Sequence, residues 1–281
     1  MRGALRPTLG SNRPPVLEQL GFAYGEEPGQ VADLWPARRQ EGALSPVVVV
    51  IHGGFWRPGY DRRLMEPLAG DAARRGWATW NLDYRVPGPS GGGWPGTFVD
   101  VARGIDHLAV MGGRHALDLR RVAIVGHSAG GCLALWSAAR DGLPAGAPGG
   151  HPHVRPGLVV SQAGVNDLIA GQQGGLGQGA VLNLMGEPAP ALGSAVDPGN
   201  RYGIASPAER LPLRVPQVLV HGRNDNVVPL EQTTAYADRA TAAGDDVTVL
   251  TIDGADHLDL IDPRHRSWLE VANRLTAFFA G

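Results

Sequence analysis

The sequence predicts an α/β fold in which a mostly parallel, doubly wound sheet carries helices on both faces. Three observations predict it. Runs such as 46–51 and 122–125 are β-branched and lack polar alternation, which is typical of strands buried on both faces. Segments with helical spacing separate these runs along the chain. A length of 281 residues, 43% of them hydrophobic, suits one large domain with an ample core.

The chain divides into a short extension and one domain. Residues 1–20 are rich in proline and arginine, and we interpret them as an N-terminal extension to a single domain at 21–281. The strands expected in that domain are 21–25, 31–35, 46–51, 78–84, 122–125, 158–162, 217–221 and 246–252. The expected helices are 65–75, 97–111, 132–139, 232–243 and 263–280. The first two strands are short and separated by a Gly/Pro turn, so we expect an antiparallel edge hairpin there.

Residues 168–205 interrupt this alternation of strands and helices. The segment begins with a Gly- and Gln-rich stretch and continues with Pro- and Ala-containing turns. It is too long for an ordinary connection, and long connections of this kind are commonly lids or binding loops. We therefore expect a short cap insertion over the strand ends, within the same domain.

Composition excludes several classes of function. The net charge is −2 with no polybasic block, which argues against a nucleic-acid partner. All 25 basic residues are arginine, so Schiff-base chemistry and a Ser–Lys dyad are excluded. The single cysteine, Cys132, excludes an internal disulfide and a cysteine-based zinc site, and we interpret it as a packed small hydrophobe.

The sequence also bears on metal, membrane and location. His151 and His153 form an H-x-H pair in a Gly/Pro loop, a pattern more typical of solvated side chains than of metal ligands. We expect no metal and no organic cofactor. No segment has the roughly 18 apolar residues of a membrane span, and the N-terminus lacks the apolar core of a signal peptide. These observations favour a cytoplasmic protein without a membrane partner.

A G-x-S-x-G pattern at 126–130 is the strongest functional signal. It follows the buried run 122–125 and precedes a predicted helix, and this strand–turn–helix context gives the motif its mechanism. The glycines let strand and helix approach closely around the turn. Ser128 would then stand at a helix N-terminus, where N–H groups favour negative charge, so it is the candidate nucleophile. The alternative is a Gly-rich turn with a capping serine.

A second glycine loop follows the strand 46–51. It reads His-Gly-Gly-Phe-Trp at 52–56, and glycines there allow a backbone path that is closed to other residues. Backbone N–H groups of such a loop can complete an oxyanion hole with the N–H after the nucleophile. The alternative is a plain turn in which His52 and Trp56 only pack.

A reactive serine needs a base, and histidine is the natural candidate in a chain without lysine. His257 follows the last expected strand in a Gly- and Asp-rich loop, whereas His52, His127 and His221 are better placed to brace loops. We predict Asp225 as the acid that orients His257. Asp167, after the preceding strand, is the alternative.

The position of these residues in the sheet supports the choice. Ser128, the glycine loop, Asp225 and His257 all come just after strands, so we expect them at the same edge of the sheet. Asp256, next to His257, is interpreted as solvated or as a brace of its loop.

These motifs resemble the α/β-hydrolase superfamily over residues 21–281. More narrowly, the chain resembles the arylformamidase (kynurenine formamidase-like) and feruloyl-esterase-like branch of the carboxylesterases. The resemblance rests on 52–56, Leu-Asp-Tyr-Arg at 82–85, 126–130, His-Gly-Arg-Asn-Asp at 221–225, Asp-His at 256–257, and the hairpin motifs at 24–25 and 33–36. The loop departs from the H-G-G-G of hormone-sensitive-lipase-like esterases, because an aromatic pair replaces the last glycine.

The resemblance implies acyl transfer to water. Ser128 would attack an ester carbonyl with His257 as base, and the N–H groups of Gly54, Phe55 and Ala129 would hold the oxyanion. A small or aromatic carboxylic ester is the first substrate class, and an N-formylkynurenine-type formamide is the alternative.

The resemblance leaves the pocket and the assembly open. Phe55, Trp56 and Trp94 would wall an aromatic pocket, or alternatively belong to the core. A homodimer is compatible with this reading. A non-catalytic small-molecule binder on the same fold is the alternative of another class.

Overall fold

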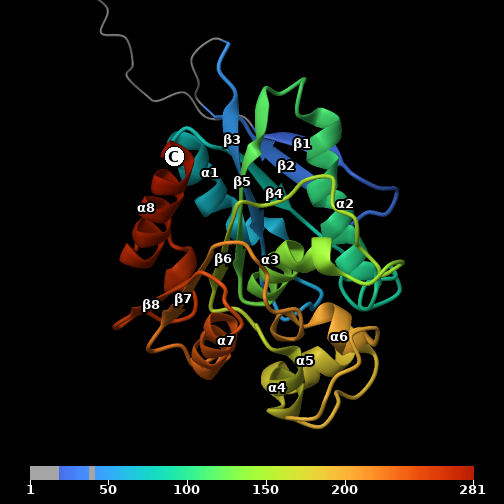
Figure 1. The fold of residues 1–281 in the computed structure, drawn as a ribbon. Helices are drawn as coiled ribbons and strands as arrows, with labels where there is room; N and C mark the ends of the chain where they lie inside the picture. Colours follow the sequence, from blue (N-terminus) through green and yellow to red (C-terminus); the bar gives the residue numbers. More distant parts are fainter. Residues whose placement is uncertain (1–18, 38–41) are drawn as a thin grey trace, which may run out of the picture.

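In the computed structural model, which describes residues 19–37 and 42–281, eight strands form one sheet in the order β1-β2-β4-β3-β5-β6-β7-β8 (Figure 1). The strands are β1 Leu20–Ala23, β2 Val31–Trp35, β3 Ser45–Ile51, β4 Ala78–Leu82, β5 Leu117–His127, β6 Leu158–Gln162, β7 Gln217–Gly222 and β8 Val247–Ile252. β1 and β2 pair antiparallel with their neighbours and the other pairs are parallel. Most of the predicted extension 1–20 lies outside the described residues.

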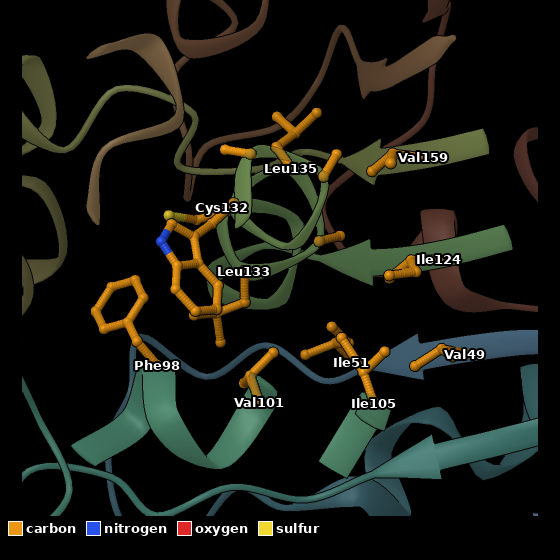
Figure 2. Packing of buried hydrophobic residues seen from close by; sticks show 14 of the residues in the cluster. Val49, Ile51, Phe98, Val101, Ile105, Ile124, Cys132, Leu133, Leu135 and Val159 are labelled. Atoms are coloured by element: carbon orange, nitrogen blue, oxygen red, sulfur yellow. The ribbon is translucent and has the colours of Figure 1, made fainter. Parts of the chain in front are cut away.

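Helices cover both faces of this sheet. β3 shows why, because Val47, Val49 and Ile51 enter one buried cluster while Val48 and Val50 enter another. The first cluster includes side chains of α2 Gly96–Met111, α3 Ala129–Ala139 and α7 Glu231–Ala242. The second includes side chains of α1 Glu66–Arg74 and α8 Arg266–Ala280. Figure 2 shows strand and helix side chains meeting in the first cluster. The doubly wound arrangement is therefore confirmed.

The strand order brings the two glycine loops together. β3 pairs with β5 so that Ile51 lies opposite Gly126, and the chain leaves both strands at the same edge. The loop that follows β3 therefore meets the turn that follows β5. β6 and β7 continue the parallel sheet beyond β5, so the loops after them reach the same edge.

The segment between β6 and β7 contains three short α-helices. They are α4 Leu168–Gln173, α5 Leu176–Met185 and α6 Arg201–Ala205, which gather at the lower edge of Figure 1. Val181, Leu184 and Tyr202 are buried in the same cluster as α3. The insertion thus packs on the main core through apolar side chains. We keep the name cap segment for residues 168–205, and its role as a cap stays a prediction.

Several boundaries differ from the prediction, most of all the starts of β5, α3 and α8, the last of which begins at Arg266 rather than Pro263. β5 begins at Leu117 rather than Val122, because Ser45 and Pro46 pair with its polar first half across a register shift. α3 begins at Ala129 rather than Cys132 although Gly130 and Gly131 disfavour helix. Close packing against β3 and β6 overrides that propensity. The remaining short helices are η1 Arg62–Met65, η2 Arg140–Gly142, η3 Pro207–Glu209 and η4 Asp259–Ile261.

Candidate active site

The turn between β5 and α3 holds Ser128 in a strained conformation. Its φ of 57° and ψ of −121° lie outside the regions that a non-glycine residue prefers. The neighbours enforce this path: a Cβ on Gly126 would lie 2.0 Å from the Gly130 carbonyl oxygen, and one on Gly130 would lie 2.1 Å from that of Ile51. The Ser128 N–H donates to the Gln162 carbonyl at 2.8 Å. Packing therefore fixes the serine at a sharp strand-to-helix turn, as the motif predicted.

His257 and Asp225 are brought together from loops 32 residues apart. Nδ1 of His257 lies 2.7 Å from Oδ2 of Asp225, and both side chains are buried. The other oxygen of Asp225 accepts the N–H groups of Val227 at 2.8 Å and Val228 at 2.9 Å. His221 approaches Oδ2 at 3.4 Å.

These contacts determine the charge of Asp225. Burial alone would raise the pKa of its carboxyl, but the hydrogen bonds from His221, His257 and Val228 outweigh it and hold the pKa well below its usual range. Asp225 is therefore an anion at neutral pH. It fixes the ring of His257 with Nδ1 toward the carboxylate, which leaves Nε2 as the nitrogen free to exchange a proton.

His127 ties the Ser128 turn to the loop of His257. Its Nε2 lies 2.9 Å from the His257 carbonyl oxygen, and the two rings are 4.5 Å apart between centroids. Burial, and secondly the neighbouring His257, lower the pKa of His127 from 6.5 to about 3. The ring is therefore neutral, and its Nε2–H donates to the carbonyl. Within the described residues no hydrogen bond joins Ser128 Oγ to His257.

The glycine loop after β3 is oriented by His52. Nδ1 of His52 lies 2.7 Å from the Gly53 carbonyl oxygen and Nε2 lies 3.1 Å from Asp83, while the ring stacks on Tyr84 at 4.3 Å. In a trans peptide the C=O and the following N–H point in opposite directions. The hydrogen bond to Gly53 therefore turns the Gly54 N–H away from the His52 ring.

The same loop lies against Ser128. A Cβ on Gly53 would lie 2.8 Å from the Ser128 Cβ, so only glycine allows this approach. Phe55 and Trp56 follow in left-handed conformations with φ of 52° and 53°. Within the part of the chain that the structure describes, the backbone N–H groups of Gly54, Phe55 and Ala129 have no hydrogen-bond acceptor. Free donors thus occur on both loops that meet at the serine.

Asp167 and Asp256, the other carboxylates considered, make contacts away from the His257 ring. Asp167 accepts the N–H groups of Ile169 and Ala170 at the start of α4 and pairs with Arg239 at 2.9 Å. Asp256 accepts the N–H groups of residues 258 and 259, which makes it a brace of the His257 loop. Of the three, only Asp225 contacts the His257 ring.

The three aromatic residues predicted to wall a pocket lie in different surroundings. Trp56 is 1% exposed and packs in the core, which agrees with the alternative given for it. Trp94 packs edge-on against Phe98 at 5.4 Å and lines a cavity of about 500 Å³ with Glu187 and Arg201, among others. Another cavity, of about 530 Å³, lies at the carboxyl end of α3, away from Ser128. Phe55 is partly buried beside the glycine loop.

Two contacts escaped the sequence analysis. Asp83 and Tyr84 hold His52, and their position directly after β4 and inside the motif at 82–85 was the available signal. Arg57 donates to the Gly177 carbonyl oxygen in the cap segment, a contact that no local pattern announces.

The described residues contain neither a metal-binding cluster nor a helix that could span a membrane. In residues 19–37 and 42–281, no three or more His, Cys, Asp or Glu side chains gather closely enough to hold a metal ion. His151 and His153 are exposed. Among the helices of those same ranges, none is both long and apolar enough to traverse a bilayer. Cys132 is fully buried, and burial raises the pKa of its thiol.

Comparisons with known proteins show a family match and two esterase relatives. The model of a family described as BD-FAE matches residues 33–239. Esterase LipC of Mycobacterium tuberculosis is 28% identical over 276 residues, which cover 92% of this chain and 63% of LipC. The carboxylic ester hydrolase LipM of the same organism, described as probable, is 31% identical over 74% of this chain and 48% of its own. The chain thus spans about half to two thirds of the length of these relatives.

Solved structures share the fold. A truncated carbohydrate esterase from gut microbiota superposes with a TM-score of 0.78 at 17% identity, covering 93% of this chain and 97% of its own. An inhibited esterase B from Lactobacillus rhamnosis has a TM-score of 0.76 at 19% identity, covering 96% and 90%. At these identities the likeness establishes the α/β-hydrolase fold and nothing finer.

Proposed function

Because this chain belongs to the BD-FAE family, we propose that it hydrolyses carboxylic esters of small or aromatic substrates through an acyl-enzyme. Ser128 is the nucleophile, His257 the base and Asp225 the acid in this proposal. The observation that carries it is the 2.7 Å contact between His257 Nδ1 and Asp225 Oδ2, made beside the strained turn of Ser128.

The first step is attack on the ester carbonyl. Nε2 of His257 takes the proton of Ser128 Oγ as the oxygen bonds to the carbonyl carbon, and Asp225 stabilises the imidazolium that forms. In unliganded enzymes such catalytic hydrogen bonds are often long and tighten only with substrate. His257 then gives the proton to the leaving alkoxide. Water repeats the sequence on the acyl-enzyme and releases the acid.

The negative oxygen of each tetrahedral intermediate needs donors. The N–H groups of Gly54, Phe55 and Ala129 are proposed for this role, supported by their lack of acceptors among the described residues. Donors preorganised at a developing oxyanion each contribute about 3 kcal/mol to transition-state stabilisation. No proton has to move for this contribution.

Turnover of p-nitrophenyl acetate and of N-formylkynurenine by wild type and Ser128→Ala tests the proposal. Ser137→Ala is the matched control, because Ser137 is another buried serine, on α3, whose hydroxyl donates to the Leu133 carbonyl. We expect ester turnover that Ser128→Ala abolishes and Ser137→Ala retains, with a fluorophosphonate adduct on Ser128 by mass spectrometry. Selective formamide cleavage would assign the alternative substrate class, and an inactive wild type that still binds ligand would overturn catalysis. A cytoplasmic location and a homodimer remain predictions from the sequence.

A further inference from the structure

The loop that carries the proposed oxyanion donors cannot hold its own shape. Phe55 and Trp56 are consecutive left-handed residues without glycine's freedom. Conformations of this kind are strained and persist only where the surroundings enforce them. Burial in the core holds Trp56 in its left-handed conformation. Phe55 is only partly buried, so another contact has to hold its conformation.

The cap segment contacts Phe55 directly. A Cβ placed on Gly177 of α5 would lie 2.6 to 2.9 Å from three atoms of the Phe55 ring, so the glycine backbone is seated on that ring. The Arg57 guanidinium lies over the same ring, 5.8 Å from its centroid. Arg57 also donates to the Gly177 carbonyl oxygen. Phe55, Arg57 and Gly177 therefore form one closed cluster that joins the donor loop to the cap segment.

The cap segment is shaped to make this contact. Gly175, Gly177, Gln178 and Gly179 all have positive φ, which bends the start of α5 out of a regular helix. Around Gly175 and Gly179 a Cβ would meet nothing within 4 Å, whereas at Gly177 it would meet Phe55. All three glycines thus adopt left-handed conformations, but only Gly177 lies against Phe55.

We propose that Gly177 and Arg57 are positioning residues that hold Phe55, and with it the proposed oxyanion donor N–H, in its left-handed conformation. The cap segment would thereby take part in catalysis without touching the substrate. This inference rests on the proposed function, because it concerns a donor for the ester oxyanion. It goes beyond that function in making the oxyanion hole depend on the docking of α5.

The test compares three substitutions of the same kind. Gly177→Ala, Gly175→Ala and Gly179→Ala each place a Cβ on a left-handed residue and carry a similar backbone cost, but only Gly177→Ala meets Phe55. We expect Gly177→Ala to lower kcat for p-nitrophenyl acetate about tenfold or more with KM changed less than threefold. The two control variants should stay within about twofold of wild type. Melting temperatures should fall in all three variants, and no less in Gly177→Ala, where the added Cβ also overlaps the Phe55 ring.

A transition-state analogue separates positioning from general damage. A trifluoromethyl ketone forms an oxyanion on the serine, so its affinity should weaken in Gly177→Ala by about the same factor as kcat/KM. Arg57→Leu should weaken it as well and Arg57→Lys less. Arg120→Leu, at an exposed arginine on β5, should leave it unchanged. Equal kcat in Gly177→Ala and its controls, with wild type active, would overturn this inference alone. Absence of Ser128-dependent turnover in wild type would overturn the proposed function itself.

Discussion

The two halves of the site around Ser128 are built by different forces. The half with Asp225 and His257 is a network of short hydrogen bonds to backbone groups and to other histidines. The half with Gly53 and Phe55 has hydrogen bonds from His52 and Arg57 but depends in addition on close contact: glycine against Ser128, and an aromatic ring against the cap segment. Hydrogen bonds fix direction and charge, whereas contact fixes position only as long as the neighbours stay in place. Substitutions that change charge should therefore impair the half with Asp225 and His257, and substitutions that add volume should impair the half with Gly53 and Phe55.

Asp225→Asn should have the largest effect. The amide keeps the volume but loses the charge and favours the wrong tautomer of His257, so we expect kcat to fall about 10⁴-fold. Steady-state kinetics with p-nitrophenyl acetate measures this. Asp167→Asn is the control, since Asp167 caps α4 and pairs with Arg239. If Asp167→Asn proves the more damaging of the two, the acid has been assigned to the wrong residue.

Gly53→Ala should damage the other half through volume alone. The new Cβ would lie 2.8 Å from the Ser128 Cβ and 2.9 Å from the His127 carbonyl oxygen, which are fixed atoms. The loop has to move, and loss of one well-placed donor typically costs about 10²-fold in kcat. Gly113→Ala, where a Cβ would meet nothing within 4 Å, supplies the control. Equal activity of the two variants would show that the loop tolerates displacement.

The two halves of the site also differ in how far they could be predicted from the sequence. The central strands were predictable because runs such as 46–51 are apolar on both faces. The placement of Ser128, Asp225 and His257 at one edge of the sheet was predictable because parallel strands end there together. The choice of Asp225 over Asp167 was open, since both follow strands, and only the contact with His257 distinguishes them.

The half with Gly53 and Phe55 was harder to predict from the sequence. Local preference argues against left-handed φ at Phe55 and Trp56, and tertiary contacts override it. The contact of Gly177 with Phe55 joins residues that no spacing rule connects. Similarly, Gly130 and Gly131 concealed the true start of α3, because their poor helix propensity is compensated by close packing.

The smallest predicted effect concerns pH and returns to the hydrogen-bonded half. His127 has a pKa of about 3 when folded and an ordinary value of 6.5, so the unfolded chain takes up its proton first as the pH falls. The stability that this group contributes is complete above pH 6.5 and is lost between pH 6.5 and 3. Replacing it by glutamine keeps an N–H donor for the His257 carbonyl but removes the titration.

Denaturant unfolding from pH 7.5 to 5 measures this effect. Between these pH values the free energy of unfolding should fall by about 2 kcal/mol more in wild type than in His127→Gln. Parallel curves for the two proteins would mean that the ring of His127 is not neutral and buried in solution.

The burial of Cys132 has a practical consequence for watching the insertion move. It is the sole cysteine of the chain and its side chain on α3 is fully buried, so maleimide dyes should leave it unmodified in the native state. A thiol introduced at Gln178, which is exposed on α5, would then be the single attachment point for a fluorophore. The emission of that dye would report whether α5 leaves the body of the molecule when ligand enters.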